Sequence, residues 1–218
     1  MRVPLAGSLG VFIWMLGNAP PLVAQAALAY DVERVAREAW HTARELAAVG
    51  GAPNRLGPVN DALKEIDRVR QIAASMPTVE GARMTLALRY ADAAARAAIS
   101  AAQDERDEMT IFIGYARSLD AQLTGLGGAA AWPLPIDELE GELWLEVDRF
   151  NEAHDAYLRA IAKGGSARAW MGLARANERL GNTLAACDAF RRAAAGALED
   201  ADKAEALGYL NSPACKLR

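Results

Sequence analysis

The C-terminal part of the sequence repeats itself after 33 residues, and this repeat constrains the fold more than any other feature. Residues 143–162 read LWLEVDRFNEAHDAYLRAIA, and residues 176–194 read ANERLGNTLAACDAFRRAA. A fixed period of this length indicates a supersecondary unit that occurs more than once and stacks on its neighbours. In this register the matching pairs are Ala153 with Ala186, Tyr157 with Phe190, and Ala160 with Ala193.

Apolar residues recur three and four positions apart along most of the chain, which predicts helices, and no segment shows the alternation of a strand. Aromatic residues make up only 6% of the chain while alanine is abundant, which favours the same all-α fold. Residues 78–123 fit either two helices with a break near 103–107 or one long bent helix. Residues 125–135, rich in glycine and proline, form the clearest linker. The other helices are expected at 31–49, 58–76, 135–147, 151–163, 167–180, 183–196 and 199–210.

Two of these predicted helices begin next to a residue suited to capping. Ser166 precedes the helix at 167–180, and Asn182 precedes the helix at 183–196. A serine or asparagine side chain at this position accepts a hydrogen bond from a free backbone N–H of the first turn. We therefore expect both side chains to cap their helices.

The repeat resembles the tetratricopeptide repeat (TPR) of exported bacterial-type proteins. That family has a tryptophan early in its first helix, small residues where the helices cross, and an aromatic residue in its second helix. The first copy departs from the pattern, with Asp137 in place of the tryptophan and Asp148 in place of the turn glycine. The second copy fits better, through Trp170, Leu173, Ala174, Gly181, Ala186, Phe190 and Ala193.

The resemblance implies antiparallel helix hairpins stacked as a short solenoid, with the helix at 199–210 as a C-terminal cap. Two hairpins bury too little surface on their own, because such stacks need about three units. The helices at 31–123 are therefore expected to pack against the hairpins, as degenerate repeats. The predicted regions are a signal peptide (1–26), an N-terminal helical region (27–131), two hairpins (132–196), and a cap with its tail (197–218).

Partners of this family usually bind the concave face formed by the first helices of the hairpins. The resemblance places one acidic and one mainly basic row of side chains on that face. Either the rows pair with each other, Glu142 with Arg175 and Glu146 with Arg179, or they form a charged groove for a peptide. The carboxylate clamp of some members is not expected, because Glu138 and Glu142 hold its places. The candidate groove residues are Glu138, Glu142, Leu145, Glu146, Arg168, Met171, Arg175, Glu178 and Arg179.

Residues 1–26 have the three-part layout of a secretory signal peptide: a positive charge at Arg2, an apolar run and a small-x-small motif. The apolar run, residues 5–16, is too short to span a bilayer, which needs about 20 residues. Cleavage is expected between Ala26 and Ala27, with a second candidate motif just after it. We therefore predict a periplasmic or secreted protein without a stable membrane span after cleavage. A buried N-terminal helix, an uncleaved anchor, and translation from Met15 are the alternatives.

The two cysteines, Cys187 and Cys215, would meet an oxidising compartment in an exported protein. If the helix at 199–210 runs antiparallel to the helix at 183–196, Cys215 returns to the end that carries Cys187. A disulfide would then close a loop of about 29 residues and stabilise the fold. Two free thiols are the alternative.

The sequence offers no arrangement of residues for catalysis. His41 and His154 stand alone, and the acidic run at 104–108 lacks the glycine and spacing of a calcium loop. The net charge of −4 and the scattered Arg and Lys residues argue against nucleic acid as a partner. We therefore expect a non-catalytic scaffold, without cofactor or metal, that binds a protein or peptide. A structural subunit of a larger assembly, self-associating through residues 31–123, is the alternative, and an enzyme with an unrecognised site is the least favoured.

Overall fold

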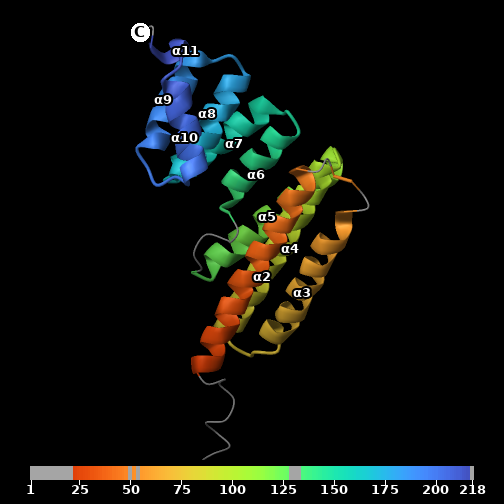
Figure 1. Cartoon of the computed structure of the whole chain (residues 1–218). Coiled ribbons are helices and arrows are strands. Elements are labelled where there is room, and N and C mark those ends of the chain that lie inside the picture. Colours follow the sequence, from red (N-terminus) through yellow and green to blue (C-terminus); the bar gives the residue numbers. More distant parts are fainter. Residues whose placement is uncertain (1–21, 49–50, 53–54, 128–133, 217–218) are drawn as a thin grey trace, which may run out of the picture.

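The computed structural model describes residues 22–48, 51–52, 55–127 and 134–216, and within these ranges the chain is helical and contains no strand (Figure 1). Consecutive helices pack against each other as hairpins. This confirms the predicted all-α fold of stacked helix hairpins. The helices are α2 (Leu22–Ala48), α3 (Leu56–Ala74), α4 (Val79–Ala102), α5 (Arg106–Gly125), α6 (Ile136–Glu146), α7 (Phe150–Ala162), α8 (Ala167–Arg179), α9 (Thr183–Ala194), α10 (Asp200–Leu210) and α11 (Pro213–Lys216).

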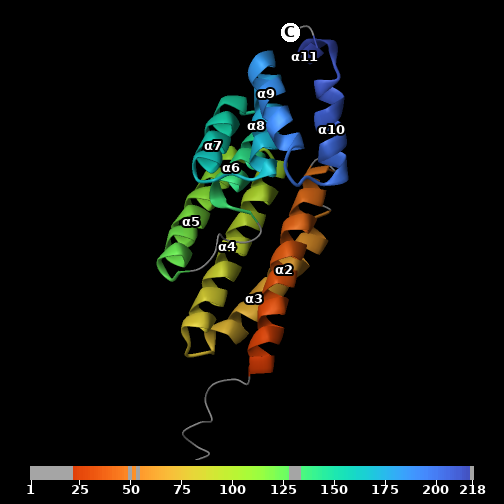
Figure 2. The same ribbon diagram turned by 90° about the vertical axis from the view of Figure 1, so that its left-hand side faces the viewer.

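Helix α4 lies at the centre of the N-terminal half and packs against α2, α3 and α5 (Figures 1 and 2). Alanine provides most of its buried surface, so the neighbouring helices can approach closely. One larger side chain, Tyr90, is also fully buried, and its hydroxyl donates a hydrogen bond of 2.6 Å to the carbonyl oxygen of Leu134. This bond fastens the chain just before α6 to the N-terminal half.

Helix α6 joins the two halves of the molecule. Leu139 and Leu143 belong to the hydrophobic core of α2–α5, whereas Leu145 packs against the core of α7–α10. Trp144 contacts both cores. The remaining helices continue from α6 in order, α7 on α6, α8 on α7, α9 on α8 and α10 on α9, so the upper half in Figure 1 is a stack of hairpins closed by α10.

Three turns between paired helices share one backbone geometry. In each, a residue with positive φ ends the first helix: Asp104 (57°), Asp148 (57°) and Gly181 (76°). The next residue donates its N–H to the carbonyl five residues earlier, as in the glycine-type helix stop. Asp148 therefore takes the place of the turn glycine, because aspartate tolerates the left-handed conformation. These bonds, each 2.8 Å, join Glu105 to Ser100, Arg149 to Trp144, and Asn182 to Asn177.

The two turns that end at Asp148 and Gly181 are 33 residues apart, so the period of the sequence is also a period of the structure. The turn at Asp104, between α4 and α5, resolves the ambiguity over residues 78–123. Two helices are present, α4 and α5, and the break needs neither glycine nor proline.

Two local expectations were wrong. Helix α2 begins at Leu22 rather than at residue 31, because no glycine or proline interrupts the chain between Pro21 and Gly50. Asn182 makes no capping bond; its amide nitrogen donates to Asn177 Oδ1 over 3.3 Å. The predicted cap at Ser166 is confirmed, since its hydroxyl accepts from the N–H of Ala169 at 3.1 Å.

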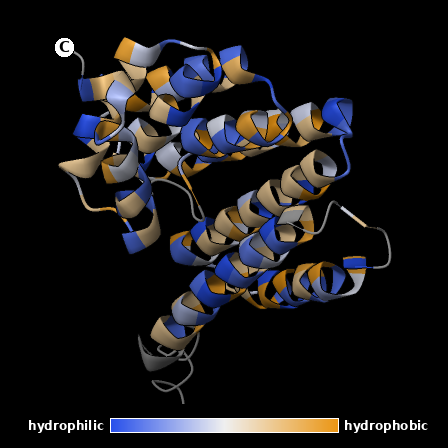
Figure 3. Cartoon of the chain, turned by 45° about the horizontal axis from the view of Figure 1, so that its top comes forward, coloured by the Kyte–Doolittle hydropathy of each residue, from blue (hydrophilic) through white to orange (hydrophobic). Residues whose placement is uncertain are grey.

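Residues 1–21, which carry most of the predicted signal peptide, lie outside the described residues. The predicted cleavage position, Ala26 and Ala27, falls within α2. None of the helices in the described ranges is long and apolar enough to cross a membrane. Hydrophobic and hydrophilic residues occupy different sides of the same helices in Figure 3, as expected for helices that pack on one face and meet solvent on the other.

Candidate interaction groove

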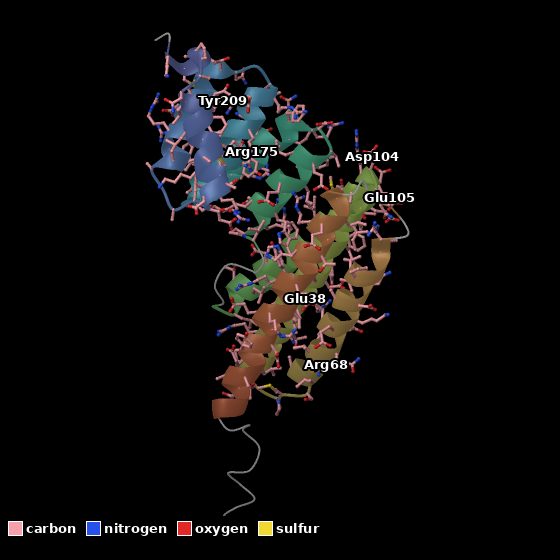
Figure 4. The ribbon with its side chains drawn as sticks, in the orientation of Figure 1. Glu38, Arg68, Asp104, Glu105, Arg175 and Tyr209 are labelled. Atoms are coloured by element: carbon pink, nitrogen blue, oxygen red, sulfur yellow. A yellow bond between two sulfur atoms is a disulfide. The ribbon has the colours of Figure 1, made fainter. Side chains whose placement is uncertain are left out.

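An open groove of about 530 Å³ lies where the C-terminal end of α2 meets α6, α8 and α10. Its charged side chains are three arginines and three carboxylates, set around an apolar floor. Figure 4 marks one of the arginines, Arg175, on α8. The lining residues are Arg44, Ala47, Glu142, Leu145, Glu146, Tyr157, Arg168, Arg175 and Asp202.

The Tyr157 ring sets the spacing of the helices below this groove. It is 1% exposed and lies between Gly141 of α6 and Gly172 of α8. A Cβ atom would come within 2.7 Å of the ring carbon Cζ at Gly141 and within 2.0 Å at Gly172. Both positions must therefore be glycine for the ring to enter. Burial, followed by the nearby Glu142 charge, raises the pKa of the Tyr157 hydroxyl well above its usual value.

Two carboxylates of α6 project into the groove with incomplete pairing. Arg44 Nη1 donates to Glu146 Oε2, while Glu146 Oε1 is buried without a hydrogen-bond partner. Arg168 Nη1 lies 3.5 Å from Glu142 Oε1. Burial raises the pKa of both carboxyl groups, and the opposing effect of Arg44 and the other nearby arginines is too small to cancel it.

Arg175 fastens α10 across one end of the groove. Its guanidinium donates to Glu205 at 2.6 and 2.9 Å and to Asp202 at 2.7 Å. The hydrogen bond to Glu205 is the main reason that the pKa of Arg175 is raised, and the bond to Asp202 adds to it. Such charge-assisted, two-point contacts are strong and directional. The position of α10, and so the end wall of the groove, depends on this arginine.

Five of the nine predicted groove residues do line the groove: Glu142, Leu145, Glu146, Arg168 and Arg175. The other four do not. Met171 is fully buried, and Glu178 is exposed outside the groove. Arg179 lies 3.1 Å from Asp148 at the turn after α6. Glu138 lies one helical turn before Glu142, in a separate hollow.

The predicted pairs of Glu142 with Arg175 and of Glu146 with Arg179 are absent. Arg175 pairs with α10, and Glu146 pairs with Arg44 of α2. The prediction considered only the two repeat copies, whereas the actual partners come from helices on either side of them. The face of α10 could have been found by extending the 33-residue register once more. Nothing in the sequence pattern indicates that Arg44 reaches α6.

The hollow beside Glu138, about 470 Å³ in volume, lies between the C-terminal end of α5, the start of α6 and the turn from α7 to α8. Glu138 is 5% exposed and accepts a 2.9 Å hydrogen bond from Ser166 Oγ. No ion pair is found for Glu138 or for Asp120, another lining residue, among the residues that the structure describes. Both carboxylates therefore lack a cationic partner there.

Asp137, next to Glu138, is the opposite case. It is 2% exposed and pairs with Lys163 at 2.5 Å and with Arg117 and Arg159 at 3.2 Å each. Burial opposes the charged form, but the hydrogen bonds from Lys163, Arg159 and Arg117 outweigh it and lower the pKa of Asp137. The two arginines also bind Glu140, so this network ties α5, α6 and α7 together.

A disulfide joins Cys187 of α9 to Cys215 of α11, with their Cα atoms 5.8 Å apart. This is the pairing that the sequence predicts. Between the two cysteines, the ring of Tyr209 on α10 packs against Phe190 at a centroid distance of 4.4 Å. The disulfide therefore holds the C-terminal end beside the last hairpin, next to the helix that closes the groove.

Within the described ranges, no group of three or more His, Cys, Asp or Glu residues is arranged to hold a metal ion. The chain matches none of the family models, curated proteins or solved structures with which it was compared.

Proposed function

We propose that this chain is a non-catalytic interaction module of the tetratricopeptide-repeat type, and that its groove binds a segment of a partner protein. The groove itself carries this proposal. Its walls come from the first helix of each successive hairpin, α6 and α8, and from the closing helix α10. A concave surface built from successive repeats is the usual binding surface of a solenoid.

Two structural features support the repeat assignment. The turns at Asp148 and Gly181 repeat after 33 residues with the same hydrogen bonds. Tyr157 fills the space between one hairpin and the next, as the aromatic residue of the second helix does in this family. The same turn geometry at Asp104 supports extending the repeat into the hairpin of α4 and α5.

We further propose that the protein is exported to the periplasm or secreted. The layout of residues 1–26 supports this, since it has the charge, apolar run and small residues of a signal peptide. The disulfide between Cys187 and Cys215 also supports it, because such bonds persist in oxidising compartments and are rare in the cytosol.

Selection of peptides from a random library tests the groove. The wild-type protein is compared with Ala47→Trp, which places a large ring in the groove, and with Ala121→Trp, which adds the same ring at an exposed position of α5. We expect selected peptides to bind wild type and Ala121→Trp and to lose affinity for Ala47→Trp. Peptides that bind all three proteins equally would contradict the proposal.

A further inference from the structure

Three carboxylates lie along one side of α6. Glu138, Glu142 and Glu146 follow each other at intervals of four residues, so adjacent members are neighbours on the helix surface, about 5–6 Å apart. Glu142 and Glu146 line the groove, and Glu138 lines the hollow one turn earlier. We call these three residues the α6 acidic row.

The α6 acidic row has unused capacity to accept hydrogen bonds. Glu138 is 95% buried by its 5% exposure, yet it receives only the hydroxyl of Ser166. Glu146 Oε1 is buried and has no partner. Glu142 has one contact with a cation, at 3.5 Å. Burying a carboxylate without a paired cation is unfavourable, so each of these groups would gain from a further donor.

The cationic groups of the groove, in contrast, are already engaged. Arg175 is bound by Asp202 and Glu205 of α10, and Arg44 is bound by Glu146. An acidic ligand would have to break these pairs to bind. A basic ligand would instead meet acceptors that lack partners, and in the hollow beside Glu138 it would also meet Asp120.

We propose that the partner segment carries two basic side chains, lysine or arginine, that pair with the α6 acidic row. One is received by Glu138 and Asp120 and the other by Glu142. Alternate side chains of an extended peptide are about 6.6–6.8 Å apart, close to the spacing of successive carboxylates on α6. An extended segment with basic residues at alternate positions fits best. This inference rests on the proposed function, since it specifies the chemistry of the segment that the same groove binds.

The probes are two synthetic peptides, one of alternating lysine and alanine and one of alternating glutamate and alanine, titrated calorimetrically at moderate salt. Wild type is compared with Glu138→Gln and Glu142→Gln, which keep the shape of the side chain. Glu178→Gln is the control, because it removes the same charge from an exposed position of α8 outside the groove. We expect the lysine peptide to bind wild type and each groove variant to weaken it about tenfold. The control should retain wild-type affinity.

Two results would overturn this inference while leaving the proposed function intact. In the first, the glutamate peptide binds as tightly as the lysine peptide. In the second, peptides selected from the random library lose affinity for Ala47→Trp but carry no basic residues. If instead no selected peptide depends on Ala47, the proposed function fails, and this inference fails with it. Circular dichroism of each variant confirms that a loss of affinity is not a loss of folding.

Discussion

Tyr157 of α7 lies directly against Gly172 of α8, so closely that a Cβ atom at Gly172 would sit 2.0 Å from the ring carbon Cζ. The nearest atoms belong to a rigid aromatic ring that is itself enclosed on its other side by Gly141. The ring therefore cannot move away to make room. The distance between the two hairpins, and with it the width of the groove, depends on these three residues.

Gly172→Ala is expected to destabilise the protein by about 1–3 kcal/mol, because the added methyl group overpacks the contact with Tyr157. Gly114→Ala in α5 is the matched control, since no atom lies within 4 Å of a Cβ there. Replacing a helical glycine at such a position should be neutral or stabilise by up to about 1 kcal/mol. Urea unfolding of both variants measures the difference. Equal stability of the two variants would contradict the packing described for Tyr157.

Much of the fold could be predicted from the sequence because it depends on local periodicity. The spacing of apolar residues places α6–α10 to within a few residues, and the 33-residue register identifies Tyr157 and Phe190 as equivalent. Asp148 was a departure from the family pattern in the sequence. The structure shows that aspartate adopts the left-handed conformation of the glycine it replaces.

The candidate site was predictable only in part, because its charge pairs connect distant parts of the chain. Arg44 reaches Glu146 across 102 positions of sequence, and Arg175 reaches Glu205 across 30. Periodicity carries no information about such partners. Gly172 was missed for a similar reason: it contacts Tyr157 of the preceding hairpin, whereas the sequence suggested that Gly141 and Ala174 allow the close approach.

Asp137→Asn is expected to lower stability at neutral pH by about 1–3 kcal/mol, because Lys163, Arg117 and Arg159 lose a charged acceptor. The pKa of Asp137 is lower in the folded protein than its ordinary value of 3.8. Its contribution is therefore present above that value and is lost as the pH falls through the lower folded-state pKa. Stability measured against pH should show wild type losing its advantage over the variant in that acidic range. A constant difference at all pH values would contradict this.

Glu142→Gln is expected to raise stability at neutral pH, since burial raises the pKa of this carboxyl group in the folded protein. The charged form is thus less favourable in the folded than in the unfolded state above the folded-state pKa. This penalty disappears as the pH falls through that pKa, so the variant's advantage should shrink in acid. Thermal unfolding at neutral and acidic pH measures the effect. A variant less stable than wild type at neutral pH would show that the contact with Arg168 outweighs burial.

Removal of the disulfide, by replacing Cys187 and Cys215 with alanine, should destabilise the protein by about 3–4 kcal/mol in the chain-entropy account. Reduced wild-type protein should unfold at the same denaturant concentration as the variant. A thiol assay on unreduced wild-type protein should detect no reactive thiol from either cysteine. Detection of two reactive thiols would show that the bond does not form in solution.

Hydrogen–deuterium exchange with a bound peptide tests the central claim most directly. A peptide selected on the wild-type protein is added at saturating concentration, and amide exchange is compared with and without it. The groove predicts slower exchange in α6, in α8 and at the C-terminal end of α2, with no change in α3 or α5. Protection confined to α3 or α5, with α6 and α8 unchanged, would show that the partner binds elsewhere and would contradict the assignment of this groove.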